Sequence, residues 1–501
     1  MSCTTNTTTS HLFNYSSLTF RLILIFHFSL FTIHYSLSQT SPDAKRTMHW
    51  YFGGYAGLDF SSGSPVAVTD GQTDTESATL TVSDTNGNLL FYSDGNYVWN
   101  RNHQLMPNSP LQSLFGMDWT DQIVAVPQPG QDNLYYIFYW EYGNAAHNTF
   151  YLLYALVDMN LDGGLGDVVS KCNIIANNHS RKIAAVKHKN GRDIWIVAHM
   201  ALSDSFYAYL LTENGLDTTP IMNQVGITDI NAIGCIKFSP DGRKMAVTFN
   251  LRGPEILDFD NTSGLITNPV AFPSCYCYSY GIEFSPDNSK LYVTYHYYGS
   301  PLTGNAVYQI DITGDSSAII QSKFLLDSIG AIDQKKNERM AIQRALDGKL
   351  YLTKHGTSKL AVINYPDQPG LACGYVDSAV YLNGMKSYNN LPPFITSYFV
   401  ADTTTEIQET LNAEGTMKIH PNPLGSSATI EIIDNVDNQN DISIEIFDLM
   451  GKKFKVNFVV LSNSSQKLKL NFDRGSLNAG LYIIKVNTGQ KTYSQKIIIT
   501  D

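Results

Sequence analysis

The feature that most constrains the fold is a strand–turn–strand unit that recurs between Trp50 and about Phe399. Each copy has an apolar strand, then a tight turn carrying Asp, Asn, Gly or Pro, then a second strand rich in Tyr, Leu and Val. The six copies occupy residues 78–92, 123–138, 183–197, 235–247, 282–293 and 340–352. They follow one another at intervals of roughly forty to sixty residues, which is the period of propeller blades.

The turn of the fourth copy shows why the chain reverses there. Pro240 presets φ for the first corner, Asp241 can bond its own backbone, and Gly242 supplies the positive φ that lets the strands pair again. More strand follows each copy, so that a unit contains about four strands. A single four-stranded sheet cannot bury both of its faces, and the units must therefore stack around an axis.

A further unit is expected to be divided between the two ends of this region. Residues 392–399 offer one strand, and residues 50–52, 57–60 and 65–68 offer three more, so that pairing them would close the ring. The sequence thus predicts an all-β chain with a seven-bladed β-propeller over residues 48–400. Six or eight blades are the alternatives, because blade boundaries in a sequence are soft.

The remaining C-terminal region is expected to form a second domain. Residues 401–416 are polar and lack periodicity, which is typical of a linker. Residues 417–501 alternate between apolar and polar side chains with period two and are interrupted by turns. This pattern predicts a small Ig-like antiparallel β-sandwich.

The N-terminus, residues 1–38, has the pattern of a signal peptide. Arg21 is the first charged residue, an apolar run occupies residues 22–33, and Ser36 and Ser38 are the small residues expected before a cleavage site. The apolar run is about twelve residues long, whereas a helix that spans a bilayer needs roughly twenty. We therefore expect export via the periplasm, a secreted or cell-surface location, and no membrane-spanning segment.

Composition and motifs exclude several classes of function. A net charge of −11 without any basic run argues against nucleic acid as a partner. Asp158, Asn160 and Asp162 resemble the start of a calcium loop, but the twelfth position is Val169, and a tight turn is the alternative. We therefore expect no metal and no cofactor. The five cysteines after residue 38 match no zinc pattern, and a strand through Cys275 and Cys277 would point them to opposite faces, which disfavours a bridge between them.

Catalytic residues are not predicted. Serine and histidine residues are scattered over different units, and no G-x-S-x-G elbow is present. The innermost strands of a propeller begin at the rim of its central funnel, where ligands usually bind. A polar funnel for a glycan, peptide or protein is therefore a hypothesis, against the alternative that strand entrances are simply solvated. Its candidate residues are Glu76, Asp121, Gln122, Lys182 and Arg339.

Several segments carry a resemblance to known families. Residues 50–60, 86–95, 98–103 and 157–167 resemble the secreted propellers common in gliding Bacteroidetes, and residues 238–242 and 284–287 resemble WD40-type and TolB-type blade repeats. Such propellers host many unrelated activities. We therefore expect a binding or adhesion protein, with an extracellular propeller hydrolase or lyase acting on a polysaccharide or lactone as the alternative.

The C-terminal region has a separate resemblance. Its order of Pro-Asn-Pro, Asp-Leu-Met-Gly, Ala-Gly-Leu-Tyr and a final Lys-containing strand is similar to a type IX secretion C-terminal sorting domain, with an ordinary Ig-like adhesion module as the alternative. The resemblance implies that the type IX secretion machinery is a partner. It also implies that the signal includes Pro421, Asn422, Pro423, Gly451, Gly480, Tyr482, Lys485 and Lys496.

Overall fold

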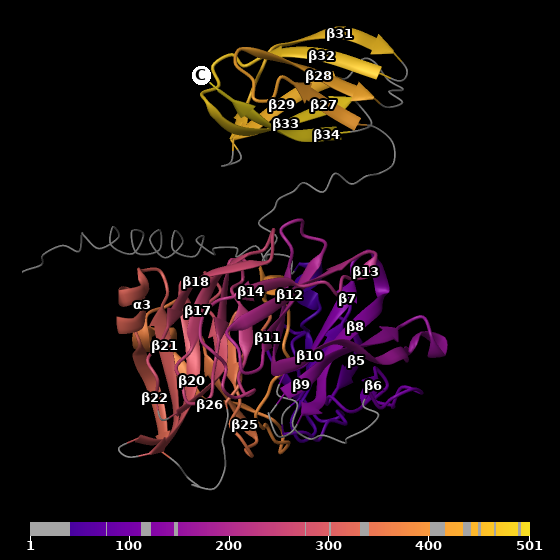
Figure 1. Cartoon of the computed structure of the whole chain (residues 1–501). Coiled ribbons are helices and arrows are strands. Elements are labelled where there is room, and N and C mark those ends of the chain that lie inside the picture. The colour runs from indigo at the N-terminus through magenta and orange to yellow at the C-terminus, as the bar shows by residue number, and fades with distance from the viewer. Residues whose placement is uncertain are drawn as a thin grey trace, which may run out of the picture. The chain divides into compact units, whose positions relative to one another are not determined.

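The chain divides between Ala401 and Asp402 into two compact units (Figure 1). The predicted signal peptide and residues 401–415 of the predicted linker lie outside the residues that the structure describes. The computed structural model describes residues 41–76, 78–111, 122–144, 149–275, 277–299, 302–330, 340–400, 416–433, 442–448, 452–464, 467–488 and 492–500.

The N-terminal unit consists of antiparallel sheets that follow one another along the chain. Two three-stranded sheets contain β1 (His49–Phe52), β2 (Ala56–Asp59) and β3 (Val66–Val68), and β4 (Leu80–Ser83), β5 (Leu89–Ser93) and β6 (Val98–Asn100). An eight-stranded sheet contains β7 (Val124–Gln128), β8 (Gln131–Asn144), β9 (Thr149–Asp158), β10 (Asp167–Lys187), β11 (Ile194–Met200), β12 (Ser205–Thr212), β13 (Gly215–Leu216) and β14 (Ile221–Gln224).

Three four-stranded sheets complete this unit. They contain β15 (Ile236–Phe238), β16 (Lys244–Val247), β17 (Glu255–Asp260) and β18 (Leu265–Ala271); β19 (Cys277–Phe284), β20 (Lys290–Gly299), β21 (Leu302–Asp311) and β22 (Phe324–Gly330); and β23 (Ile342–Arg344), β24 (Leu350–Leu352), β25 (Lys359–Ile363) and β26 (Tyr375–Tyr381). The helical elements are short: α2 (Pro42–Lys45), α3 (Ser316–Gln321) and the 3-10 turns η2 (Asp162–Gly164), η3 (Gly370–Cys373) and η4 (Thr396–Phe399). No helix among the described residues is long and apolar enough to cross a membrane.

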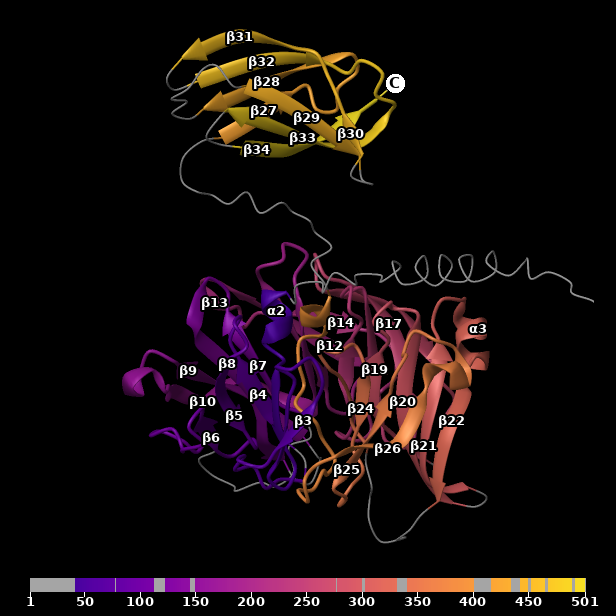
Figure 2. The same ribbon diagram turned by 180° about the vertical axis from the view of Figure 1, so that it is seen from behind.

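These sheets are arranged around an axis, as the sequence predicts. The strands β1, β4, β7, β10, β15, β19 and β23 each contact the next in turn, so that one strand of each unit lies innermost. The first sheet, which contains β3, and the last, which contains β24–β26, lie near one another in Figure 2, and Trp50, Leu58, Tyr351 and Leu360 share one buried cluster where the ring closes. The N-terminal unit is therefore a β-propeller. Dividing the eight-stranded sheet at the register shift between His179 and Ile183 of β10 gives seven blades, but its hydrogen bonding is continuous, so the count of seven stays a prediction.

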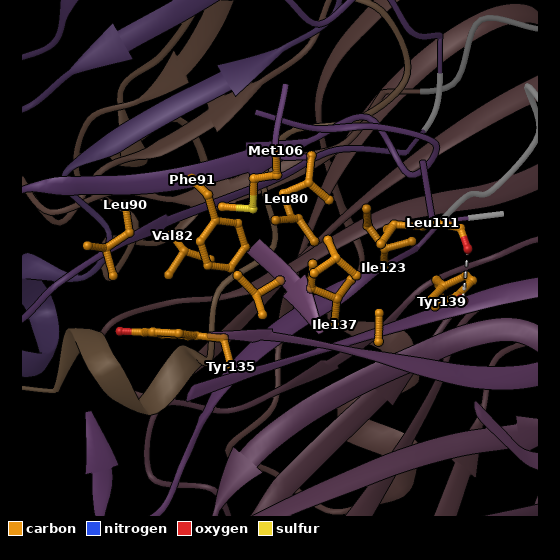
Figure 3. Close-up of a cluster of buried hydrophobic side chains, with 14 of the residues drawn as sticks. Leu80, Val82, Leu90, Phe91, Met106, Leu111, Ile123, Tyr135, Ile137 and Tyr139 are labelled. Atoms are coloured by element: carbon orange, nitrogen blue, oxygen red, sulfur yellow. Dashed lines mark hydrogen bonds between the residues drawn. The ribbon is translucent and has the colours of Figure 1, made fainter. Parts of the chain in front are cut away.

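Apolar side chains fill the spaces between neighbouring sheets. Between β4–β6 and β7–β9, Leu80, Phe91, Ile123 and Ile137 are almost completely buried, and the Tyr139 hydroxyl donates to the Leu111 carbonyl at 3.3 Å (Figure 3). A blade cannot bury such a face alone, and it does so only against its neighbour.

The predicted turn chemistry is present in the fourth copy. The Asp241 Oδ1 accepts from the Ser239 hydroxyl at 2.6 Å and from the Arg243 N–H at 3.1 Å, and Gly242 has φ of 68°. In the fifth copy, Asn288 takes the same left-handed place with φ of 64°, which asparagine tolerates better than most residues. Local side-chain chemistry therefore places the turns.

The strand predicted for residues 392–399 is wrong. The first sheet has only β1, β2 and β3, and Thr396–Phe399 forms the turn η4. Pro392 and Pro393 lack the N–H that a strand ladder needs, which explains the failure. The ring instead closes where Trp50 of β1 packs edge-on against Tyr351 of β24, with ring centroids 5.7 Å apart.

The expectation for Cys275 and Cys277 is also wrong. The two residues form a disulfide. Strand β19 begins only at Cys277, so Cys275 lies outside the strand and the alternation of faces does not apply to it.

The C-terminal unit is the predicted antiparallel β-sandwich. One sheet has the order β27 (Thr416–His420), β28 (Ser427–Ile433), β32 (Lys467–Asp473), β31 (Phe458–Ser464). The other has the order β30 (Lys453–Phe454), β29 (Ile442–Asp448), β33 (Gly480–Thr488), β34 (Thr492–Ile499). Alternate residues of the strands face inward, and Ile430, Leu470, Ile446 and Ile484 are completely buried in one core.

Candidate functional site

The residues predicted for the funnel rim differ in their exposure where the structure describes them. Glu76 is exposed, and its carbonyl accepts from the Asn389 N–H at 3.0 Å. Gln122 and Lys182 are buried, and Asp121 and Arg339 lie outside the described residues. The ligand-binding role of these five residues stays a prediction.

Lys182 forms a buried ion pair. Its Nζ lies 2.5 Å from Asp229 Oδ2 and 3.1 Å from the Asn231 carbonyl, with the Phe249 ring 5.3 Å away. His199 is buried beside Asp229, and burial lowers the pKa of this imidazole to about 4. At neutral pH the histidine is therefore uncharged, and Lys182 and Asp229 compensate one another.

Gln122 joins two inner strands. Its Oε1 accepts from the N–H of Ile183 in β10 at 3.2 Å and from the N–H of Ile236 in β15 at 3.1 Å. One amide side chain thus satisfies two buried donors. Gln122 therefore has a structural role, because it links the inner strands β10 and β15.

The chain itself occupies the central channel. Cavities of only about 10 to 20 Å³ remain between residues 390–398 and the inner strands β4, β7, β10, β15, β19 and β23. A volume of this size holds about one water molecule. Within the described part of the chain, the protein's own segment 389–399, which we call the axial segment, therefore lies among these inner strands.

Polar side chains of the channel wall hold the axial segment. The Tyr280 hydroxyl donates to Asn390 Oδ1 at 2.8 Å, and Arg344 donates to the Phe399 carbonyl at 3.1 Å. Lys237 lies 3.1 Å from Glu283 and 2.5 Å from Gln343 Oε1. Lys237 of the wall is thus paired with Glu283, whereas Arg344 bonds to the axial segment itself.

An open groove lies on the face of the propeller that carries the tight turns. Two adjoining cavities of about 630 and 420 Å³ share Lys189, Asp241, Arg243 and Asn261. Volumes of roughly 300 to 1,000 Å³ are typical of small-molecule sites. We call this the turn-face groove, and it is lined by residues 186–189, 239, 241–244, 258–262 and 267, by Asn288 and by Ser397.

The groove contains both paired and unpaired charges. Lys244 Nζ lies 2.7 Å from Asp258 Oδ1, and although burial raises the pKa of Asp258, hydrogen bonds from Lys244 and Asn268 outweigh burial and hold this pKa below its ordinary value. Within the described part of the chain, neither Lys189 nor Arg243 has an ion-pair partner. Lys189 and Arg243 are thus available to an acidic or hydroxyl-rich ligand, in a groove that also contains the carboxylates of Asp241 and Asp260.

His188, at the edge of the groove, is engaged with the backbone. Its Nδ1 accepts from the Asn190 N–H at 3.0 Å, so that Nε2, 3.0 Å from the Thr262 carbonyl, is the donor. These two backbone hydrogen bonds favour a structural role for the imidazole at the turn.

The predicted sorting-signal residues lie mostly at the ends of strands in the C-terminal unit. The Asn422 amide donates to the Lys496 carbonyl at 3.0 Å and accepts from the Ile498 N–H at 2.9 Å, with Pro421 and Pro423 on either side of it. Tyr482, in the strand that Gly480 begins, donates to the Asn478 carbonyl at 3.1 Å.

The two lysines of the signal differ in their surroundings. Lys485 Nζ lies 5.4 Å from the centre of the Phe447 ring, and Lys496 is exposed. Gly451 lies outside the described residues. The part that these eight residues play in sorting stays a prediction.

Comparison with known families decides the nature of the C-terminal unit. Residues 418–500 match the family model described as the secretion system C-terminal sorting domain. The C-terminal unit is a sorting domain. This sorting domain indicates export through the type IX secretion system, to the outer surface of the cell or beyond it.

Solved structures give weaker likenesses. A Bacteroides uniformis protein proposed to be a 6-phosphogluconolactonase is 13% identical, with a TM-score of 0.43 over 67% of this chain and 97% of that one. The β-propeller domain of Myceliophteria thermophila Cps50 (Swd1) is 9% identical, with a TM-score of 0.37 over 63% and 95%. Sqt1 from Chaetomium thermophilum is 10% identical, with a TM-score of 0.36 over 87% and 99%. The propeller assignment rests on the strand contacts, and no curated protein matches the chain.

The sequence reading missed the turn-face groove and the axial segment. The one local indication of the axial segment is the pair Pro392 and Pro393, because two adjacent prolines disfavour a central strand at this position. Nothing in the sequence marked Lys189 and Arg243 as neighbours, since they belong to different blades and meet only in the folded ring.

Proposed function

We propose that this chain is a binding protein of the outer cell surface or the medium, in a member of the Bacteroidetes. The sorting domain supports export, and the turn-face groove of the propeller is the proposed ligand site. The ligand is an acidic or hydroxyl-rich molecule, such as a glycan or a peptide, bound by the protein without chemical change.

The observation that carries this proposal is the contrast between the channel and the groove. The channel is packed, whereas the groove has the volume of a small-molecule site and two cations without an ion-pair partner among the described residues. Hydrogen bonds from a cation to an anionic or neutral acceptor contribute about 1.5 to 3 kcal/mol each. Lys189 and Arg243 are therefore the residues whose loss should weaken binding most.

The test uses the full mature chain on glycan and peptide arrays, followed by titration of each positive ligand. We expect Arg243→Ala and Lys189→Ala to weaken binding roughly tenfold or more. Lys359→Ala is the matched control, because Lys359 is exposed on β25 in a different blade. Equal affinity of all three variants would show that the groove is not the binding site.

The same preparation tests the enzyme alternative. An enzyme needs convergent titratable groups or a metal in an accessible site. Among the described residues, no group of three or more His, Cys, Asp or Glu residues is placed to hold a metal ion. Turnover of a polysaccharide or lactone by the purified chain would contradict the binding proposal and support the enzyme alternative.

A further inference from the structure

One edge of the sorting-domain sandwich is left open. The opposite edge of the sandwich, where β27 and β34 lie, is closed by backbone hydrogen bonds. The Leu424 N–H donates to the Ile498 carbonyl at 2.8 Å, and the Thr500 N–H donates to the Leu424 carbonyl at 2.9 Å. Strand β30 has only two residues. Strand β31 has seven, and no described strand pairs with its outer side.

Three adjacent exposed residues of β31 are apolar. Val459, Val460 and Leu461 have 64%, 43% and 52% of their surface exposed. Free edges are usually blunted by Lys, Pro or short length, because unpaired N–H and C=O groups invite another strand. The sequence of β31, FVVLSNS, contains neither Lys nor Pro. Strand β31 has one register shift, between Val460 and Ser462, but it lacks the Lys, Pro and short length that usually reject another strand.

The charge of the domain indicates what kind of strand fits. Residues 418–500 contain ten Lys and Arg against seven Asp and Glu, a net charge of +3 in a chain whose total is −11. Lys469 and Lys467 of β32 lie opposite Ser462 and Ser464 of β31. Lys467 pairs with Glu431 at 2.6 Å, and two lysines beside this one carboxylate leave a net positive charge near the edge. Two copies of the domain would bring these like charges together, which disfavours self-pairing.

We propose that β31 is the strand by which the sorting domain is recognised, and that an extended apolar and acidic segment of the export machinery pairs with it as a fifth strand of its sheet. Backbone hydrogen bonds along β31 supply affinity, and the exposed valine and leucine side chains with the bordering lysines supply selectivity. This inference rests on the proposed export of the chain through that machinery.

The test introduces a charge on the edge and measures export of the full chain in a type IX-competent host. Lysine on a free edge disfavours pairing with another strand, and in Val459→Lys and Leu461→Lys we expect at least about tenfold less chain outside the cell. Ile433→Lys is the matched control, because Ile433 is 46% exposed on the same sheet but lies on the inner strand β28. Export of both edge variants at the level of the control overturns the proposal.

Two further measurements separate the possible causes. The thermal unfolding curves of the purified edge variants should match that of the control. If one edge variant unfolds at a lower temperature than the control, export is judged from the other edge variant alone. A photo-reactive residue at position 460 should form an adduct with an outer-membrane component of the export machinery. An adduct with a second copy, or with the propeller of the same chain, overturns the proposal.

A deletion of residues 418–500 distinguishes this proposal from the export on which it rests. If the deleted chain is retained while both edge variants are exported, export by the sorting domain stands and the β31 edge is not its recognition strand. If the deleted chain is still exported, the proposed export itself fails, and the role of β31 fails with it.

Discussion

Glu255 gives the N-terminal unit a dependence of stability on pH that one substitution should remove. Its side chain is 1% exposed at the start of β17, and Oε2 accepts from the Ile227 N–H at 3.1 Å. Its Oε1 is buried and has no hydrogen-bond partner among the described residues. Burial raises the pKa of this carboxyl to about 7, although the Ile227 hydrogen bond opposes the rise.

The magnitude follows from the two pKa values. The carboxyl has a pKa near 4.5 in the unfolded chain and about 7 in the folded one, so the folded state binds the proton more tightly. The stability that this group contributes is fully present below pH 4.5 and is lost as the pH rises to 7. The loss amounts to about 3 kcal/mol and stays constant above pH 7.

The assay compares Glu255→Gln with the wild-type chain in urea at pH 5 and pH 8. All five tryptophans precede residue 401, so their fluorescence reports the propeller alone. Glutamine cannot ionise, and the stability of the variant relative to wild type should therefore rise by about 2 to 3 kcal/mol between the two pH values. Taking this difference cancels any constant cost of placing an amide at this position.

The control is Glu213→Gln, since the Glu213 side chain is 54% exposed and forms only a surface ion pair with Arg192. Its stability relative to wild type should change by less than about 0.5 kcal/mol between pH 5 and pH 8. If Glu255→Gln behaves like Glu213→Gln, the Glu255 carboxyl ionises without penalty and the reasoning from its burial is refuted.

Two further substitutions test the interior of the propeller. Asp229→Asn leaves the Lys182 ammonium buried without its counter-charge and should lower the free energy of unfolding by about 3 to 5 kcal/mol. Combining it with Lys182→Met should recover much of this loss. Urea unfolding at pH 7 measures both effects. Ile395→Ala removes a buried side chain of the axial segment and should cost about 3 kcal/mol, whereas Val376→Ala, at an exposed position of β26, should cost less than about 1 kcal/mol; equal costs would show that the axial segment does not stabilise the ring.

The sequence predicted best those features that are decided within a few residues. The turn at residues 239–243 follows from the chemistry of Ser, Pro, Asp and Gly in one short stretch, and the structure forms it. The alternation of apolar residues likewise predicted the β-sandwich. By contrast, Lys182 was expected at a solvated rim, and its burial depends on Asp229, which comes from a loop 47 residues later. No local sequence pattern predicts an ion-pair partner so far away in the chain.

The axial segment explains how the ring of sheets can close although no blade is formed jointly by the two ends of the propeller region. Residues 390–398 contact inner strands from several blades at once, so the segment joins the blades from the centre, while Trp50 and Tyr351 join the first and last blades at the seam. A ligand that entered the channel would first have to displace Ile395 and Tyr398 from their buried positions and break the bonds to Asn390 and Phe399. Binding in the turn-face groove requires no such displacement, and the groove is therefore the energetically cheaper place for a ligand.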